Sequence, residues 1–157
     1  MNISKLFLIV TFVLATSSIQ AVAQSNESRK IIDQTEYGYA QANAVTTSGP
    51  MLYVSGQVGV SDTGKNDFYS QVDRSFERLA SVLEKSGARA EDVVKITLLI
   101  VDMDPEKLAY MIKKRRAFFA KGYPASTLIP VARLYADGVK FEIEAIALLP
   151  NPAASSN

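Results

Sequence analysis

Hydrophobic and polar positions alternate along this chain with periods that distinguish helices from strands. Residues 67–86 carry an apolar stripe at helical spacing, formed by Phe68, Val72, Phe76, Leu79 and Leu83. Gly87 is well suited to end that helix. Residues 93–101 form a nearly continuous apolar run rich in β-branched side chains, which predicts a central strand.

A second helix is predicted to begin at Asp104 and Pro105, because Asp is a favourable N-cap and Pro fits the first helical turn. Its buried side is expected to consist of Leu108, Met111, Ile112, Phe118 and Phe119. The basic run at 113–116 is interpreted as the solvated side of this helix, in the half where the helix dipole favours cations.

Five shorter patterns predict the remaining strands, which are expected at 30–33, 39–46, 51–56, 128–134 and 139–149. The second and third are expected to pair as a hairpin, because residues 48–50 between them form turns readily. Residues 124–127 are interpreted as a turn-rich entry to the predicted strand at 128–134. In the predicted strand at 139–149, apolar residues alternate with Lys140, Glu142 and Glu144, which is typical of a half-buried strand.

Together these elements predict an α+β domain in which two helices cover one face of a mixed β-sheet. The domain is expected to span residues 30–149. A flexible N-terminal segment (24–29) and a disordered tail (150–157) are expected to flank it.

Residues 1–23 are predicted to be a secretory signal peptide. They combine Lys5, an apolar run at 6–15 and the small residues at 21–23 that suit a cleavage site. The apolar run is shorter than the roughly 20 residues that a spanning helix needs, although an uncleaved anchor is the alternative. The mature chain is therefore expected to begin at Gln24 and to be periplasmic or secreted.

Composition excludes several kinds of chemistry. Without Lys5 the chain has 16 basic and 16 acidic residues, so no overall charge favours nucleic acid or a membrane surface. It has no cysteine and no histidine, which excludes thiolate nucleophiles, serine–histidine triads and the usual zinc sites. It also has no glycine-rich phosphate loop. No metal or nucleotide cofactor is expected.

Five short motifs follow one another along the chain. They are G-Y-A-Q at 38–41, V-S-G-Q at 54–57, D-V-V-K at 92–95, V-A-R-L at 131–134 and E-I-E-A-I-A at 142–147. With this order and spacing, the chain resembles the RidA family of reactive-intermediate (enamine/imine) deaminases across residues 30–149. The resemblance implies a chorismate-mutase-like fold, a homotrimer with clefts between subunits, and no cofactor.

The resemblance also implies which residues do the chemistry. By position, the family's cleft tyrosine falls on Tyr39, its cleft serine on Ser55 and its water-orienting glutamate on Glu142. Hydrolysis of a C=N bond needs an oriented water, a carboxylate that relays protons and donors around the tetrahedral centre. Without the resemblance, Glu142 would be interpreted as a solvated strand carboxylate, whereas Tyr39 and Ser55 would fit a strand-edge aromatic and a turn hydroxyl equally well.

The chain departs from the family pattern at the substrate-binding positions. Imine-hydrolysing members carry an arginine directly after Pro-Ala that binds the substrate carboxylate through two hydrogen bonds. That position is Ser126, followed by Thr127, and Ile112 replaces an asparagine that is common on the second helix. Activity toward 2-imino acids is therefore expected to be low, and Ser126→Arg is expected to raise it.

Three other cations are candidates for the arginine's role, although the sequence supports none of them. Lys140 and Arg115 are two of these. Arg133 is the third, and it is interpreted as structural, paired with Glu142 or Glu144. Whether any cation points into the cleft formed by Tyr39, Ser55, Ser126 and Glu142 therefore distinguishes between the possible functions.

Three functions remain open at this point. The first is an exported hydrolase (deaminase) of small imine or enamine intermediates. The second is a non-catalytic trimeric module that binds a small ligand or another protein in the same cleft. The third, a mutase-like activity on the same fold, normally uses several cleft arginines. None of these involves nucleic acid or stable membrane insertion after cleavage.

Overall fold

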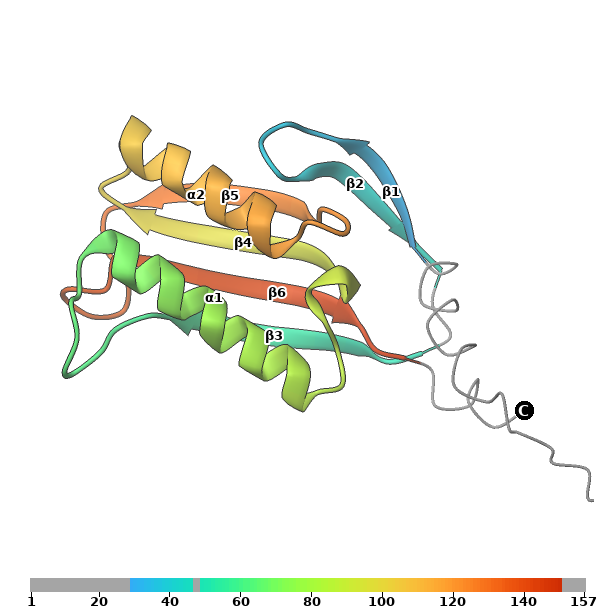
Figure 1. Ribbon diagram of the computed structural model, residues 1–157, viewed down its shortest axis with the longest axis horizontal. Helices are drawn as coiled ribbons and strands as arrows, with labels where there is room; N and C mark the ends of the chain where they lie inside the picture. The colour runs from blue at the N-terminus through green and yellow to red at the C-terminus, as the bar shows by residue number, and fades with distance from the viewer. Residues whose placement is uncertain (1–28, 47–48, 151–157) are drawn as a thin grey trace, which may run out of the picture.

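The computed structural model of the protein describes residues 29–46 and 49–150, which fold into a β-sheet layer and a helical layer (Figure 1). The predicted signal peptide lies outside the described residues, as do residues 24–28 of the predicted flexible segment and 151–157 of the predicted tail. None of the described helices combines the length and apolar character needed to span a membrane.

The sheet is mixed and both helices cover the same face of it, as predicted (Figure 1). The strands are β1 (Arg29–Gln34), β2 (Ala40–Val45), β3 (Met51–Val58), β4 (Val93–Val101), β5 (Ala125–Val131) and β6 (Phe141–Leu148). The helices are α1 (Phe68–Lys85) and α2 (Pro105–Phe118), and a short 3-10 helix, η2 (Ala90–Asp92), precedes β4. The strand order is β1-β2-β5-β4-β6-β3, with β5 parallel to both β2 and β4.

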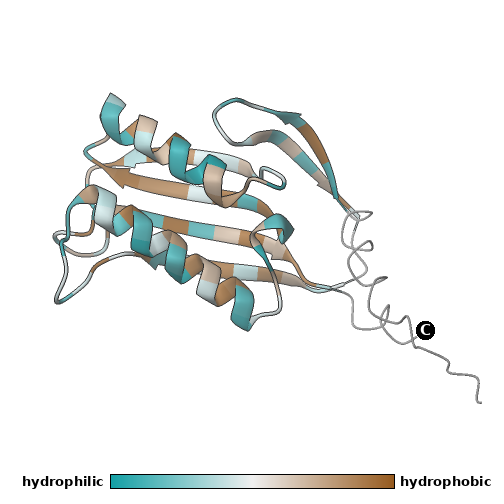
Figure 2. Ribbon diagram, viewed as in Figure 1, coloured by the Kyte–Doolittle hydropathy of each residue, from teal (hydrophilic) through white to brown (hydrophobic). Residues whose placement is uncertain are grey.

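Helix α1 forms as its pattern predicts. Asp67 caps it, with Oδ1 accepting a hydrogen bond from Ser70 N at 2.8 Å. The apolar stripe that begins at Phe68 is buried along its whole length, and Phe76 stacks on Phe141 of β6. Figure 2 shows apolar stretches in the central strands β4 and β6, next to the helices. The core therefore lies between the helices and the middle of the sheet.

Helix α2 begins at Asp104 and Pro105 as predicted, but the prediction for its faces is partly wrong. Asp104 Oδ1 accepts a hydrogen bond from Lys107 N at 2.8 Å. Leu108 is 39% exposed, and Arg115 of the basic run is buried. The segment before β2 packs against the later turns of α2, so that a cation in those turns is enclosed between this segment and the sheet.

The predicted hairpin between the second and third strands is wrong. β2 pairs with β1 and, at Ala40 and Ala125, with β5, whereas β3 pairs with β6 at the other edge. A local turn signal indicates a change of direction but does not select a strand's partner. Here Ala40 N donates to Pro124 O at 2.9 Å, so β2 joins the start of β5. Residues 125–127 accordingly belong to β5 and are not a turn.

Candidate functional site

Glu142 lies on the sheet face opposite the helices. Its neighbours Phe141 and Ile143 are buried in the core, and side chains alternate between the faces of a strand. The half-buried Glu142 is paired with Val58 on β3 and Leu99 on β4. Its carboxylate forms no salt bridge with any other residue that the structure describes.

A β-bulge brings the V-S-G-Q motif against this carboxylate. The β3–β6 pairing shifts between Val54 and Gln57, so that Ser55 and Gly56 both lie opposite a single residue of β6. A Cβ atom at Gly56 would lie 1.7 Å from Glu142 Oε1. Only glycine leaves room for the carboxylate there. Ser55 and Glu142, two predicted catalytic residues, therefore lie on one face of the sheet, with Glu144 as the residue opposite Ser55.

Ser55 lines an open hollow of about 390 Å³ on the same face. Lys95 and Glu144 also line it, and Lys95 Nζ donates a hydrogen bond to Thr127 Oγ1 beside it. Burial lowers the pKa of Lys95, and the charge of Glu144 opposes that shift. Thr127, a predicted substrate-binding residue, thus belongs to the same open face as Ser55.

Ser126 and Tyr39 lie on the helical side and meet around Arg115. Arg115 Nη1 donates to Ser126 Oγ at 3.0 Å, and the guanidinium carbon is 5.2 Å from the centre of the Tyr39 ring. Arg115 Nε and Nη2 donate to Tyr37 O at 3.2 and 2.5 Å. The arginine is 4% exposed, and burial lowers its pKa.

The sequence interpretation of Arg115 as a solvated cation is therefore wrong. A signal for its burial was present, since Met111, Arg115 and Phe119 follow one another at four-residue steps and all three are buried. A long cationic side chain in an apolar stripe was the feature that sequence reasoning passed over.

Gly38 of the G-Y-A-Q motif allows the segment before β2 to approach α2 this closely. Its φ of +79° lies in the left-handed region, and a Cβ there would lie 2.6 Å from Arg116 Cγ. Two hydrogen bonds join the ends of this segment, residues 35–39: Thr35 N and Thr35 Oγ1 both donate to Tyr39 O, at 2.8 and 2.9 Å. This geometry presents Tyr37 O to Arg115.

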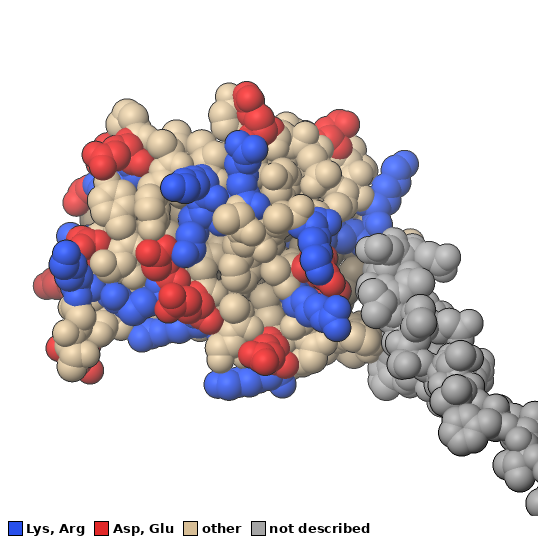
Figure 3. Space-filling view, viewed as in Figure 1, with Lys and Arg blue, Asp and Glu red and all other residues tan. Residues whose placement is uncertain are grey.

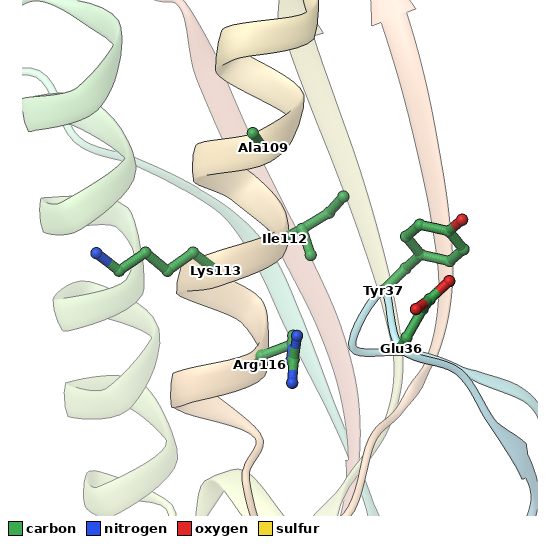
Figure 4. Close-up of a pocket in the computed structure, with 6 residues that line it drawn as sticks. All are labelled: Glu36, Tyr37, Ala109, Ile112, Lys113 and Arg116. Atoms are coloured by element: carbon green, nitrogen blue, oxygen red, sulfur yellow. The ribbon is translucent and has the colours of Figure 1, made fainter.

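Ile112 lines an open pocket of about 520 Å³ between α2 and this segment (Figure 4). The other lining residues are Glu36, Tyr37, Ala109, Lys113 and Arg116. Figure 4 shows Ile112 and Arg116 projecting from α2 toward the side of Glu36 and Tyr37. Within the described parts of the chain, none of Glu36, Lys113 and Arg116 forms a salt bridge, so the pocket wall carries two unpaired cations and one unpaired carboxylate.

Arg133 does not pair with Glu142 or Glu144, contrary to expectation. Its Nε is 3.1 Å from Asp137 Oδ1, and its side chain is 66% exposed. β5 ends at Val131, so Arg133 lies in the following loop and reaches an acidic residue four positions later. Glu142 thereby keeps its carboxylate unpaired.

The predicted site residues thus form two groups that do not meet within one chain. Ser126 is paired with Ile96, Ile96 is paired with Ala145, and Glu142 is three residues from Ala145. Ser126 and Glu142 are thus separated by two strand spacings of about 4.8 Å each and by three residues of about 3.3 Å each along the strand. Their Cα atoms are therefore about 14 Å apart. Their side chains also lie on opposite faces. No group of three or more acidic residues within 29–46 and 49–150 is placed to hold a metal ion.

Comparisons with known proteins agree with this fold and these motifs. The model of the family described as Endoribonuclease L-PSP matches residues 32–149. The chain is 34% identical to the RutC family protein YjgH of Escherichia coli (strain K12) over 116 residues, which cover 73% of this chain and 87% of that protein. It is 36% identical over 106 residues to the 2-iminobutanoate/2-iminopropanoate deaminase of Salmonella typhimurium, covering 64% of this chain and 80% of the deaminase.

A solved structure is similar over most of its length. The Rid-family protein YyfB of Yersinia pestis, described as of unknown function, superimposes with a TM-score of 0.70 at 28% sequence identity. The match covers 78% of this chain and 99% of that one. The chain therefore belongs to the RidA-like family whose model is described as Endoribonuclease L-PSP, as its five motifs predicted.

Proposed function

We propose that this protein is a cofactor-independent hydrolase that deaminates small imine or enamine intermediates. The observation that carries the proposal is the unpaired carboxylate of Glu142, which lies over Gly56 on the same sheet face as Ser55. The 36% identity to a 2-iminobutanoate/2-iminopropanoate deaminase supports the class of substrate.

In the proposed reaction Glu142 acts as the proton relay. Its carboxylate accepts a proton from a water molecule as the water oxygen bonds to the imine carbon and the C=N π bond breaks, and Glu142 then passes that proton to the imine nitrogen. The carbinolamine that results transfers its hydroxyl proton to the nitrogen by the same relay, the C–N bond breaks, and ammonia leaves a carbonyl product. The Ser55 hydroxyl is assigned as a hydrogen-bond donor to the oxygen on the tetrahedral carbon. A positioned general base of this kind typically contributes about 10²- to 10⁴-fold in rate.

We also propose that a homotrimer completes the site. The two groups of candidate residues face opposite sides of one chain's sheet, so a neighbouring copy is needed to bring Glu142 near Tyr39 and Ser126. The face that carries Glu142 exposes large apolar side chains, including Tyr53 (71%) and Ile129 (41%), which favours burial against another copy. On the helical face, by contrast, Figure 3 shows basic and acidic side chains interspersed.

Export to the periplasm or the exterior is part of the proposal. It rests on Lys5, the apolar run at 6–15 and the small residues at 21–23. Mass spectrometry of the exported protein is expected to show Gln24 as the first residue. Soluble protein that retains Met1 would contradict a cleaved signal peptide.

The activity is tested with an assay that generates an imine in situ and follows its loss. The wild-type protein is expected to accelerate hydrolysis, and Glu142→Gln is expected to lower kcat about 100-fold or more without unfolding the protein. Glu77→Gln, which changes an exposed carboxylate on α1, is the control and is expected to keep the wild-type rate.

The alternative function is a non-catalytic trimeric module for a small ligand or a protein partner. It is favoured by Ser126, which occupies the position of the family's substrate-binding arginine. A wild-type protein that binds the carbonyl product yet leaves the imine lifetime unchanged would establish this alternative and reject the hydrolase.

A further inference from the structure

We propose that Arg115 is the oxyanion anchor of this site, a guanidinium supplied by helix α2 that binds the carboxylate of the ligand. The inference rests on the proposed function and deepens it, because it names ligands that carry a carboxylate next to the reacting carbon. The sequence places only Ser126 at the strand position that carries an arginine in imine-hydrolysing relatives. The structure brings Arg115 to that position from another element, with Nη1 3.0 Å from Ser126 Oγ.

Arg115 is a buried cation without an acidic partner. None of the five salt bridges among residues 29–46 and 49–150 includes it. The half-buried Arg29 differs, since it lies within the electrostatic influence of the Asp92 carboxylate. Burying an unpaired charge is costly, and an anion that binds beside it offsets the cost.

The guanidinium also keeps donors available. It has five N–H groups, of which Nε and one on Nη2 donate to Tyr37 O and one on Nη1 donates to Ser126 Oγ. Each terminal nitrogen therefore retains one N–H without an acceptor in the described chain. A carboxylate has two oxygens with which to accept such a pair.

Its surroundings hold the guanidinium in place before any ligand arrives. The Tyr37 carbonyl fixes one edge and the Tyr39 ring lies 5.2 Å away, so that little side-chain freedom remains to be lost on binding. Tyr37 also belongs to the wall of the 520 Å³ pocket, where Lys113 and Arg116 are unpaired. With the single carboxylate of Glu36 in the same wall, these two cations leave the pocket with a net positive charge, which favours anions.

A purely structural Arg115, which only ties the segment before β2 to α2, would contribute to stability alone. The anchor and the structural role are separated by measuring ligand binding directly. The probe is 2-oxobutanoate, the unreactive carbonyl product of a carboxylate-bearing imine, and its neutral counterpart is butan-2-one. Titration calorimetry is done on the full mature protein.

The wild-type protein is expected to bind 2-oxobutanoate at least about tenfold more tightly than butan-2-one. Arg115→Met is expected to weaken 2-oxobutanoate binding by about tenfold or more. Arg29→Met is the control, because Arg29 is half-buried and, like Arg115, donates to backbone carbonyls, those of Glu91 and Tyr123. It is expected to lower the melting temperature without changing either affinity.

A second measurement does not depend on the folding of Arg115→Met. The Nε–H resonance of Arg115, assigned by its absence from the spectrum of Arg115→Lys, is expected to shift as 2-oxobutanoate is added. A resonance that stays fixed at high 2-oxobutanoate overturns the proposal even when Arg115→Met unfolds.

The remaining outcomes distinguish the anchor from the hydrolase. Equal affinity of the wild type and Arg115→Met for 2-oxobutanoate, or no binding to the wild type, overturns the anchor. Binding that depends on Arg115, with no acceleration of any imine, supports the anchor and rejects the hydrolase. Imine hydrolysis that is indifferent to Arg115→Met supports the hydrolase and rejects the anchor.

Discussion

Gly56 and Glu142 are in direct contact across the β3–β6 pair, where a Cβ atom on Gly56 would lie 1.7 Å from Glu142 Oε1 and 2.5 Å from its Cδ. The absence of a side chain at Gly56 therefore decides where the carboxylate lies. The β-bulge at the same place turns Ser55 toward that carboxylate's face. One glycine thus links the geometry of β3 to the position of the proposed proton relay.

Gly56→Ala is expected to reduce imine hydrolysis far more than it reduces stability. The new methyl group displaces the flexible end of Glu142, which can rotate away without disturbing the backbone. Because a misplacement of about 1 Å can cost on the order of 100-fold in rate, kcat is expected to fall by about 10- to 100-fold. Steady-state kinetics and thermal unfolding of the same preparation measure both effects.

Gly87→Ala is the control for Gly56→Ala. Gly87 has a φ of +76° with nothing within 4 Å of its virtual Cβ, so alanine there costs about 1 kcal/mol of stability through backbone strain. Its activity is expected to remain at the wild-type level. A Gly56→Ala protein with the full wild-type rate would show that Glu142 does not act from the position described here.

Assembly is predicted to depend on the open face of the sheet. Ile129 is paired with Leu99, which is paired with Glu142, so all three lie in one row of that face. Ile129→Lys would bury unpaired charges between copies, and it is expected to convert the proposed trimer into monomers in sedimentation equilibrium. Imine hydrolysis is expected to be lost with it.

Leu108→Lys is the matched change on the other face, because Leu108 is 39% exposed and Ile129 is 41% exposed. It is expected to leave both the assembly and the activity unchanged. A wild-type protein that is a clean monomer at micromolar concentration would refute the trimer and the site between subunits together.

The elements that depend on local rules were predicted well from the sequence. The stripe beginning at Phe68 and the capping residue Asp104 each act within a few residues of themselves, and α1 and α2 begin within a residue of the predicted positions. The strand at 93–101 has the predicted bounds. Its bounds are set by its own apolar run, whichever strands flank it.

The features that depend on distant residues were not predicted. The partner of β2 is fixed by Ala40 and Pro124, which are far apart in the sequence, and no turn signal near residue 49 contains that information. The motifs gave the positions of the site residues but not the faces on which they lie. Ser126 and Thr127 are adjacent and therefore face opposite sides of β5, which follows only once Ala125 is known to begin the strand.

The stability contributed by Asp104 is predicted to depend on pH. The backbone hydrogen bond from Lys107 N, followed by the Lys107 side chain, lowers the pKa of Asp104 below its usual value of 3.8. Because the folded pKa is below the unfolded one, the contribution is complete above the unfolded pKa and is lost as the pH falls through the folded pKa. Asp104→Ala is expected to lower the melting temperature at pH 7, and its difference from wild type is expected to shrink below about pH 4.

Asp104→Asn keeps the capping oxygen and removes the charge. It is expected to melt between wild type and Asp104→Ala at pH 7 and to coincide with wild type in acid. Circular dichroism at a series of pH values measures all three proteins. A difference between wild type and Asp104→Ala that stays constant down to about pH 2.5 would show that the carboxylate charge contributes nothing.

The contact between Arg115 and Ser126 reverses the expectation for Ser126→Arg. From the sequence alone this substitution should raise activity, because it restores the family's arginine. In the structure Arg115 Nη1 already lies 3.0 Å from Ser126 Oγ, so a second guanidinium would be forced against the first. Two like charges about 4 Å apart repel by about 4 kcal/mol at an effective dielectric constant near 20. Ser126→Arg alone is therefore expected to lower the melting temperature and to bring no gain in kcat/KM.

The double variant Arg115→Met/Ser126→Arg is expected to behave differently, because it moves the guanidinium from the helix to the strand and leaves one cation at the site. Its kcat/KM for a carboxylate-bearing imine should exceed that of Arg115→Met by about tenfold or more, with little change for a neutral imine. Both imines are generated in situ and compared across wild type, the two single variants and the double variant. A gain from Ser126→Arg alone as large as the gain in the double variant would mean that the two guanidinium groups do not share one place, and that Arg115 lies apart from the ligand's carboxylate.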